Sequence, residues 1–355
     1  QRITRGMTSF ALANHYAKTS GTLSFFYNWG KHWINDGYHL GGDPLDYRFH
    51  SRDRMLGVSW YQSVQLFEGN RLTVGFDYFH FGGEAWNKTL AGERDTQADK
   101  TQDDVAGYID FRQNLGDWLT FDVGLRVDHH SGTEWVPQVG FSFHLPENSE
   151  VKLMASKGFR YPTIREMYMF RPANPDLKPE RLWSYELSFA QRLLDGRLSH
   201  GVNVFYIDGE NLIMRMPIDG RPLNVNTGKI ENSGVEAQVA YRIVSAWSVD
   251  ANYSYLHMDN PVLASPEHKL YAGTAFSKGR WNVSTGLQYV AGLYKELDPE
   301  ETEDFLLWNV RGSFRVLDGF DVWVKGENLL AQRYEINAGF PMPKATVMAG
   351  VNIKF

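Results

Sequence analysis

The sequence predicts an all-β protein, a transmembrane antiparallel β-barrel in which this chain supplies about seventeen strands. Three observations predict this fold: alternating apolar and polar residues, connections that alternate between short and long, and many aromatic residues without a long apolar run. Within residues 119–127, Phe121 and Val123 fall on one face and Asp122 falls on the other. Such a period of two indicates a strand whose two faces meet different environments.

Composition narrows the class of protein. The chain has 355 residues, a formal net charge of −6, 14% aromatic residues and no cysteine. The negative balance gives no indication of a nucleic-acid partner, and a chain without cysteine forms neither disulfides nor thiolate metal sites. No apolar run reaches the length of a membrane-spanning helix, whereas a membrane strand needs only about 9–11 residues and keeps one polar face.

The same alternation predicts further strands along the chain. We expect them at 72–78, 235–242 and 281–289, besides 119–127 and a closing strand at 347–355. The chain stops on an aromatic residue, Phe355, which resembles the terminal signal of outer-membrane barrels.

The connections alternate between two lengths. Short turns rich in Gly, Asn, Asp and Ser are expected at 19–21, 68–70, 115–117, 146–148, 194–196, 244–246, 277–279 and 317–319. Long connections are expected between them, at 29–50, 82–103, 161–180, 214–229 and 295–304, with shorter ones near His129, Asn260 and Gly339. Short periplasmic turns and long extracellular loops are typical of outer-membrane barrels. A soluble propeller or sandwich is the alternative, but the chain has no internal repeat of a propeller blade.

The connection 161–180 is the first place to look for function. Four prolines interrupt any strand there, at positions 162, 172, 175 and 179. Loops of about twenty residues are usually functional or disordered, and the aromatic and methionine residues in this one argue against disorder. Arg160 before the loop and Glu180 after it are expected to pair across its base.

Three segments together resemble the TonB-dependent outer-membrane receptor family. They are residues 158–163 with 174–180 and 185–186, residues 226–228 with 232–236, and residues 326–330 with 333–335 followed by the closing strand. Their order and spacing carry the resemblance, which covers essentially the whole chain.

The resemblance implies a cellular location and a set of partners. Receptors of this family have a 22-stranded barrel in the Gram-negative outer membrane, closed by an N-terminal plug and energised by the protein TonB. We expect residues 1–355 to be one C-terminal part of such a barrel, without the plug and about five strands. The expected partners are outer-membrane lipid, a metal-chelate ligand and TonB, the last through the region that this chain lacks.

Candidate ligand residues follow from the resemblance and from residue chemistry. Residues 159–162 and 174–177 are similar to two boxes that flank a heme-ligating histidine in the heme-receptor branch, yet no histidine lies between them here. Tyr and Met also serve as heme ligands, which leaves Tyr161, Met167, Tyr168 and Met169. Arg165 and Arg171 are further recognition candidates on the same loop.

Other loops add histidine and tryptophan candidates for a bulky, partly apolar chelate. These are His32, Trp33, His39, His80, Trp86, His129 and His130. Because His129 and His130 are adjacent, they would face opposite sides of a strand. Asp36, Asp43 and Asp46 could bind calcium, although they lack the spacing of a dedicated calcium loop.

The function expected from the sequence is TonB-dependent import of an iron–siderophore or heme. The alternatives are a corrinoid importer of the same family, a passive pore, and a surface barrel that captures ligand without transport. No nucleophile–base arrangement or metalloprotease motif stands out, so we expect no enzyme activity.

Overall fold

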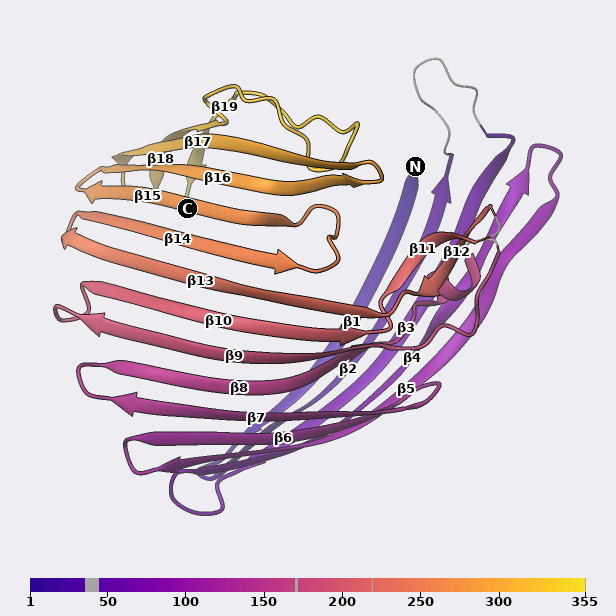
Figure 1. Cartoon of the computed structure of the whole chain (residues 1–355), viewed down its shortest axis with the longest axis horizontal. Helices are drawn as coiled ribbons and strands as arrows, with labels where there is room; N and C mark the ends of the chain where they lie inside the picture. The colour runs from indigo at the N-terminus through magenta and orange to yellow at the C-terminus, as the bar shows by residue number, and fades with distance from the viewer. Residues whose placement is uncertain (36–44, 170–171, 219, 355) are drawn as a thin grey trace. The chain divides into compact units, whose positions relative to one another are not determined.

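Strands make up nearly the whole of the computed structural model, which describes residues 1–35, 45–169, 172–218 and 220–354 (Figure 1). The first strands are β1 (Arg2–His15), β2 (Thr19–Ile34), β3 (Tyr47–Val64), β4 (Asn70–Thr89), β5 (Arg94–Leu115), β6 (Leu119–His129), β7 (Thr133–Leu145) and β8 (Ser149–Arg160). A five-residue π-helix, η1 (Arg165–Met169), follows in the connection after β8.

The remaining elements are all strands. They are β9 (Glu180–Leu193), β10 (Leu198–Glu210), β11 (Ile213–Ile218), β12 (Arg221–Asn226), β13 (Lys229–Val244), β14 (Trp247–Met258), β15 (Pro266–Lys278), β16 (Trp281–Leu297), β17 (Glu300–Leu317), β18 (Phe320–Glu327) and β19 (Thr346–Ile353). Within the described ranges, no helix is long and apolar enough to cross a membrane.

Neighbouring strands pair antiparallel. The pairing runs from β1 to β6 and again from β13 to β19, while β11 and β12 form a separate hairpin. Counted over the described residues, seventeen strands belong to the large sheet. The predicted all-β class and strand number are therefore confirmed.

The chain divides into two compact units. Unit 1 contains Gln1–Phe141, Ala155–Trp183 and Gly209–Lys229. Unit 2 contains Ser142–Met154, Ser184–Asp208 and Ile230–Phe355. In unit 2, three buried residues, Val290, Leu293 and Phe305, form an apolar cluster against which Tyr334 packs.

The predicted period of two holds along the strands of unit 1. On β2 the exposed side chains occupy every second position, at Leu23, Phe25, Tyr27, Trp29, Lys31 and Trp33. Register pairs Phe25 with Val58, Val58 with Tyr78, and Phe111 with Val123, so these side chains share one side of the sheet. We call this side of unit 1 the apolar face.

The opposite side of the same strands carries polar and charged groups, and we call it the cavity face. Asp53 on β3, Asp104 on β5 and Asp128 on β6 lie there. Arg126 bonds Asp77 at 2.5 Å and Asp128 at 2.9 Å on this face. Pairing of this kind satisfies charges that a mixed, half-buried surface would otherwise leave without partners.

Several predicted connections are shorter than expected because strands continue through them. Residues 82–103 were predicted to be a long loop, but β4 runs to Thr89 and β5 begins at Arg94. The cross-strand pair of Glu84 with Arg94, at 2.7 Å, stabilises this extension, and such pairs depend on register rather than local propensity.

Three further connections also differ from the prediction. The hairpin β11–β12 occupies most of 214–229. Strands β16 and β17 reach Leu297 and Glu300, which leaves only a tight turn within 295–304. Residues 19–21 belong to β2, so the short turn precedes them.

The predicted loop 161–180 is a connection between β8 and β9, as its prolines indicated. It contains η1, and among its described residues only the last one, Glu180, belongs to a strand, the start of β9. The predicted closing strand is present as β19, while Phe355 lies outside the described residues.

Candidate functional site

A cavity of about 910 Å³ lies in unit 1, between the cavity face of β2–β5 and the start of the connection after β8. Its lining comes from strand residues such as His32, Asp53 and Phe81 and from loop residues such as Tyr161 and Arg165. Small-molecule sites commonly enclose about 300–1,000 Å³ and combine apolar walls with a few polar groups. The cavity therefore has the size and the mixed lining of a ligand site.

One wall of the cavity carries a charged cluster. The Arg5 guanidinium lies 3.2 Å from the His32 ring and 4.0 Å from Asp53, and His32 lies 3.7 Å from the same carboxylate. Arg5 is 63% exposed, so its charge remains accessible from the cavity. Arg5 can donate hydrogen bonds to an anionic ligand through the N–H groups that do not contact His32 or Asp53.

Aromatic rings form a second wall. His130 stacks on Phe81 at 5.9 Å and contacts Tyr161 at 4.7 Å between ring centroids. The Tyr161 hydroxyl donates a 2.9 Å hydrogen bond to the Gly132 carbonyl. Burial, together with nearby carboxylates, raises the pKa of Tyr161 to about 12, so its phenol stays neutral at physiological pH. Its hydroxyl proton is engaged with Gly132, so Tyr161 helps to position this wall.

Residues 162–165 and Met169, from the start of the connection after β8, cover one side of the cavity, and we call them its roof. The roof contains a capping box. Thr163 donates from its backbone and hydroxyl to Glu166, both at 2.8 Å, and the Glu166 amide donates back to the Thr163 hydroxyl at 3.2 Å. This reciprocal pattern fixes the first turn of a helix. Here it orients η1 and holds Ile164 and Arg165 against the cavity.

Glu166 also joins the roof to the base of the loop. Arg160 donates to Glu166 at 2.8 and 3.1 Å and to Glu180 at 2.6 Å, which confirms the expected pairing across the loop base. Burial raises the pKa of Glu166, but the bonds from Arg160 and Thr163 outweigh burial and leave this pKa below its usual value. The carboxylate is thus held ionised between two partners.

Hydrogen bonds from the hairpin β11–β12 stabilise the loop 161–180. The buried Asn224 side chain donates to the Glu166 carbonyl at 2.7 Å, and Asn174 donates to the Asn224 carbonyl at 2.8 Å. Asn226 exchanges hydrogen bonds with the backbone of Lys178 at 2.9 and 3.0 Å. These bonds satisfy loop backbone groups that a strand ladder would otherwise satisfy.

A buried carboxylate fixes the neighbouring strand ends. Glu134 is 4% exposed at its side chain and accepts hydrogen bonds of 2.6 and 2.8 Å from Arg181, with Lys157 at 3.6 Å. The Arg181 bonds, aided by Lys157, hold the pKa of Glu134 below its usual value.

The structure brings five of the predicted candidates together at the cavity. They are His32, His130, Tyr161, Arg165 and Met169. The predicted divergence of the adjacent pair is also observed, because His130 lines the cavity while His129 pairs with Val105 on the apolar face.

The other candidates lie elsewhere. Trp33, His80 and Trp86 belong to the apolar face, where His80 bonds Asp103 at 2.9 Å and Trp86 stacks on His50 at 5.3 Å. Met167 is buried at 7% exposure, and Tyr168 lies under the Lys100 ammonium at 4.9 Å. His39 and Arg171 lie outside the described residues.

The described residues form no group of three or more His, Asp or Glu side chains that could hold a metal ion. Of the aspartates considered for calcium, Asp36 and Asp43 lie outside the described residues.

Sequence reasoning missed the residues that organise the cavity. The sequence contains a signal for Glu166, because Thr163 followed three residues later by Glu166 matches the capping-box pattern. Glu134 was not, because its partner Arg181 is 47 positions away and only strand packing brings the two together.

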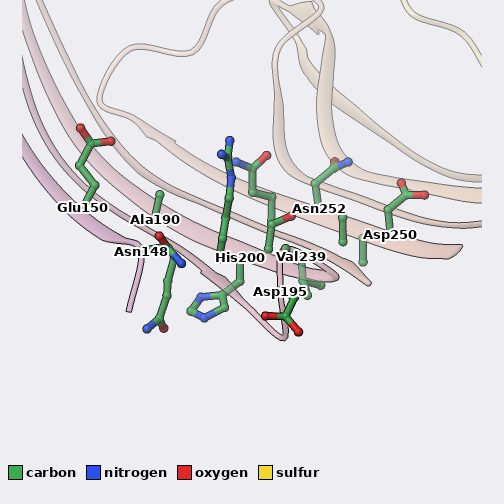
Figure 2. A pocket seen from close by; sticks show the side chains of 15 residues that line it. Asn148, Glu150, Ala190, Asp195, His200, Val239, Asp250 and Asn252 are labelled. Carbon is green, nitrogen blue, oxygen red and sulfur yellow. The ribbon is translucent and has the colours of Figure 1, made fainter. Parts of the chain in front are cut away.

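A second hollow, of about 670 Å³, lies in unit 2 near the short turns. Figure 2 shows its labelled side chains pointing to different sides of the strands, with His200 and Asp195 on one side and Glu150 and Asn252 on the other. These groups do not converge on a common point, so the cavity of unit 1 is the stronger candidate site.

Comparison with known proteins identifies the family. The family described as "TonB dependent receptor-like, beta-barrel" matches residues 2–329. The chain is 22% identical over 316 residues to the vitamin B12 transporter BtuB of Photobacterium profundum, covering 84% of this chain and 50% of that protein. It is 21% identical over 335 residues to the ferripyoverdine receptor of Pseudomonas aeruginosa, covering 83% and 41%.

Solved structures show the same fold. The copper transporter OprC superimposes with a TM-score of 0.84 at 15% identity, over 99% of this chain and 65% of that one. The chain thus spans about half the length of the curated relatives it matches. Its strands are those of an outer-membrane receptor barrel rather than of an enzyme, and the chain belongs to the TonB-dependent receptor β-barrel family.

Proposed function

We propose that the protein containing this chain imports a bulky metal chelate across the outer membrane in a TonB-dependent manner. The observation that carries this proposal is the cavity of about 910 Å³ in unit 1. Its volume lies at the upper end of the range for small-molecule sites, which fits a large ligand. The aromatic wall of Phe81, His130 and Tyr161 and the exposed cation Arg5 also fit a ligand that is partly apolar and partly anionic.

An iron–siderophore complex is the first ligand class to test. The accessible Arg5 and the Arg165 of the roof offer cations to an anionic chelate, while His130 and Phe81 offer flat apolar surface. The similarity of this chain to the ferripyoverdine receptor also supports this ligand class.

A corrinoid is the second candidate. The specific observation in its favour is the match to the vitamin B12 transporter, which covers 84% of this chain. Heme fits less well, because the loop has no histidine and the Tyr161 hydroxyl is engaged with Gly132.

The test of transport is uptake by whole cells expressing the full-length protein. Radiolabelled iron–siderophore, cobalamin and hemin would be offered separately, with and without a protonophore and in cells lacking TonB. Active import predicts accumulation of one ligand that stops in both treated cultures. Accumulation that survives both treatments would instead identify a passive pore, and binding without accumulation would identify a surface receptor.

The test of the cavity is binding to purified full-length protein. Replacing Arg5 and Arg165 together with alanine should weaken ligand binding at least tenfold, since both side chains line the cavity. A matched control replaces Lys18 and Lys278, two exposed cations at or beside short turns, and should bind as the wild type does. Equal loss in both variants would refute the cavity as the site. A hemin absorbance shift upon titration would favour heme.

A further inference from the structure

The apolar face of unit 1 changes character along β2 and β3. Starting near the short turn, the exposed residues of β2 run from Leu23 and Phe25 through Trp29 to Lys31. On β3 the same face runs from Val58 to Arg54 and Arg52. Register pairs Trp29 with Arg54 and Lys31 with Arg52, so aromatic and cationic side chains form adjacent rows across the strands.

The cationic row lies just beyond the expected hydrocarbon layer. Lys31 is twelve residues after Thr19, the first residue of β2, and a tilted membrane strand uses about 9–11 residues. Aromatic side chains such as Trp29 mark the interface in outer-membrane barrels. The row lies toward the long connections, which face the outside of the cell in this class of barrel. It is therefore at the level of the outer-leaflet headgroups.

Two grooves on this face meet at Lys31 and Arg52. One, of about 530 Å³, also has Arg2, Trp33 and Trp86 in its lining. The other, of about 510 Å³, has Trp29, Arg54, Glu84 and Asp99 in its lining. Arg94 adjoins the grooves through its contacts with Glu84 and Trp86. We give the name basic rim surface to eight side chains of this face: Arg2, Lys31, Arg52, Arg54, Arg94, Trp29, Trp33 and Trp86.

Charge within the basic rim surface is only partly balanced. Glu84 pairs with Arg52 at 3.5 Å and with Arg94 at 2.7 Å. Arg94 and Arg52 also lie over the Trp86 ring, at 4.2 and 5.7 Å. These contacts fix the two guanidinium groups, since Arg stacks on aromatic faces while keeping its remaining donors free.

Lys31 and Arg54 differ from these two arginines. Within the described part of the chain neither forms an ion pair with a carboxylate, although Lys31 lies 5.9 Å from the Trp29 ring centre. The basic rim surface thus presents five cations, whereas three carboxylates, Glu84, Asp99 and Asp53, line the two grooves, so positive charge is in excess.

We propose that the basic rim surface binds the phosphate groups of lipopolysaccharide, the phosphorylated glycolipid of the outer leaflet. Arginine binds phosphate bidentately and lysine binds it as a point charge. The apolar residues below the row, such as Phe25 and Val58, lie where the acyl chains of the same molecule would extend. This continuity from apolar to aromatic to cationic favours a lipid over a soluble phosphate. The inference depends on the outer-membrane family and not on the transported ligand.

Binding of bisphosphorylated lipid A to delipidated full-length protein in detergent tests the proposal. The main variant is Lys31→Glu with Arg54→Glu, and Lys31→Gln with Arg54→Gln is a milder second variant. The charge-matched control is Lys18→Glu with Lys278→Glu, at or beside the short turns. Further probes are dephosphorylated lipid A, phosphatidylglycerol and inorganic phosphate, and heat-modifiable migration in gels reports barrel folding.

We expect at least tenfold weaker lipid A binding by the main variant, a smaller loss for the glutamine variant and no change in the control. Dephosphorylated lipid A should bind the wild type at least tenfold more weakly than lipid A. Binding of the variants within twofold of the wild type would overturn the proposal. So would equal binding of phosphatidylglycerol or of dephosphorylated lipid A, competition by millimolar inorganic phosphate, or cross-links from this face to a second copy of the protein.

Discussion

Charged side chains in unit 1 occur in two contrasting settings. Around the loop after β8, Arg160, Glu166 and Glu180 bind one another, and Glu134 is enclosed by Arg181 and Lys157. On the apolar face, in contrast, exposed apolar residues are followed by cations of which Lys31 and Arg54 lack a carboxylate partner within the described chain.

The difference shows two uses of charge. In the loop network, charge fixes the backbone geometry that shapes a cavity, and the groups are satisfied within the protein. On the apolar face, charge is placed where an external partner can satisfy it. Each of the following predictions tests one side of this contrast.

The largest effect is expected from Glu134→Ala. Removing one partner of a buried ion pair typically costs about 3–5 kcal/mol. Here Lys157 loses its contact with a carboxylate, while Arg181 keeps a 3.2 Å bond to Glu210. Urea unfolding of the full-length protein in detergent measures this loss. The matched variant Glu150→Ala removes a carboxylate that is 29% exposed, and we expect a cost below about 1 kcal/mol. Equal losses would show that burial of Glu134 does not matter.

The next effect is expected from Val123→Arg on the apolar face. A cation that faces lipid at mid-bilayer costs about 2–4 kcal/mol. The control is Gln138→Arg, which should cost far less, because the Gln138 side chain contacts the Asp110 carboxylate at 3.0 Å and an arginine there would lie beside this negative charge. Spin labels at Val123 and Asp122, in a chain without cysteine, should report lipid and water respectively. The same environment at both positions would contradict the assigned faces.

A smaller effect is expected from Asn224→Ala, which removes the hydrogen bond to the Glu166 carbonyl. Leaving a buried carbonyl unsatisfied costs about 1–3 kcal/mol. We expect faster hydrogen exchange in residues 161–169, while amides of β13–β19 serve as an internal control. Unchanged exchange in the loop would show that the hairpin does not support it.

The smallest effect is expected from acid pH. Because the pKa of Glu166 is lowered in the folded state, its stabilisation is complete above the unfolded value of about 4.3 and is lost as pH falls through the folded value. A spin label at position 165 should therefore gain mobility below about pH 4.3. In Glu166→Gln the label should be mobile at every pH.

Local pattern by itself determined which residues share a face of a strand, although not where each strand ends. The alternation at Phe121, Asp122 and Val123 places these residues on opposite sides wherever the strand lies, because side chains of a strand repeat every two residues. Prolines ended the strands at the loop 161–180, and Arg160 with Glu180 stood at its two ends. These features depend only on neighbours in the chain.

Tertiary structure decided which residues share a site. Residues 84–100 became paired strands because Glu84 and Arg94 meet across them, and His130 joined Phe81 and Tyr161 through pairing of distant segments. Glu134 and Arg181 meet although 47 positions separate them. The row formed by Lys31 and Arg52 likewise exists only in the observed register. Register is set by contacts between strands, and a one-residue shift would move every side chain to the other face, so the sequence pattern alone could not assign these partners.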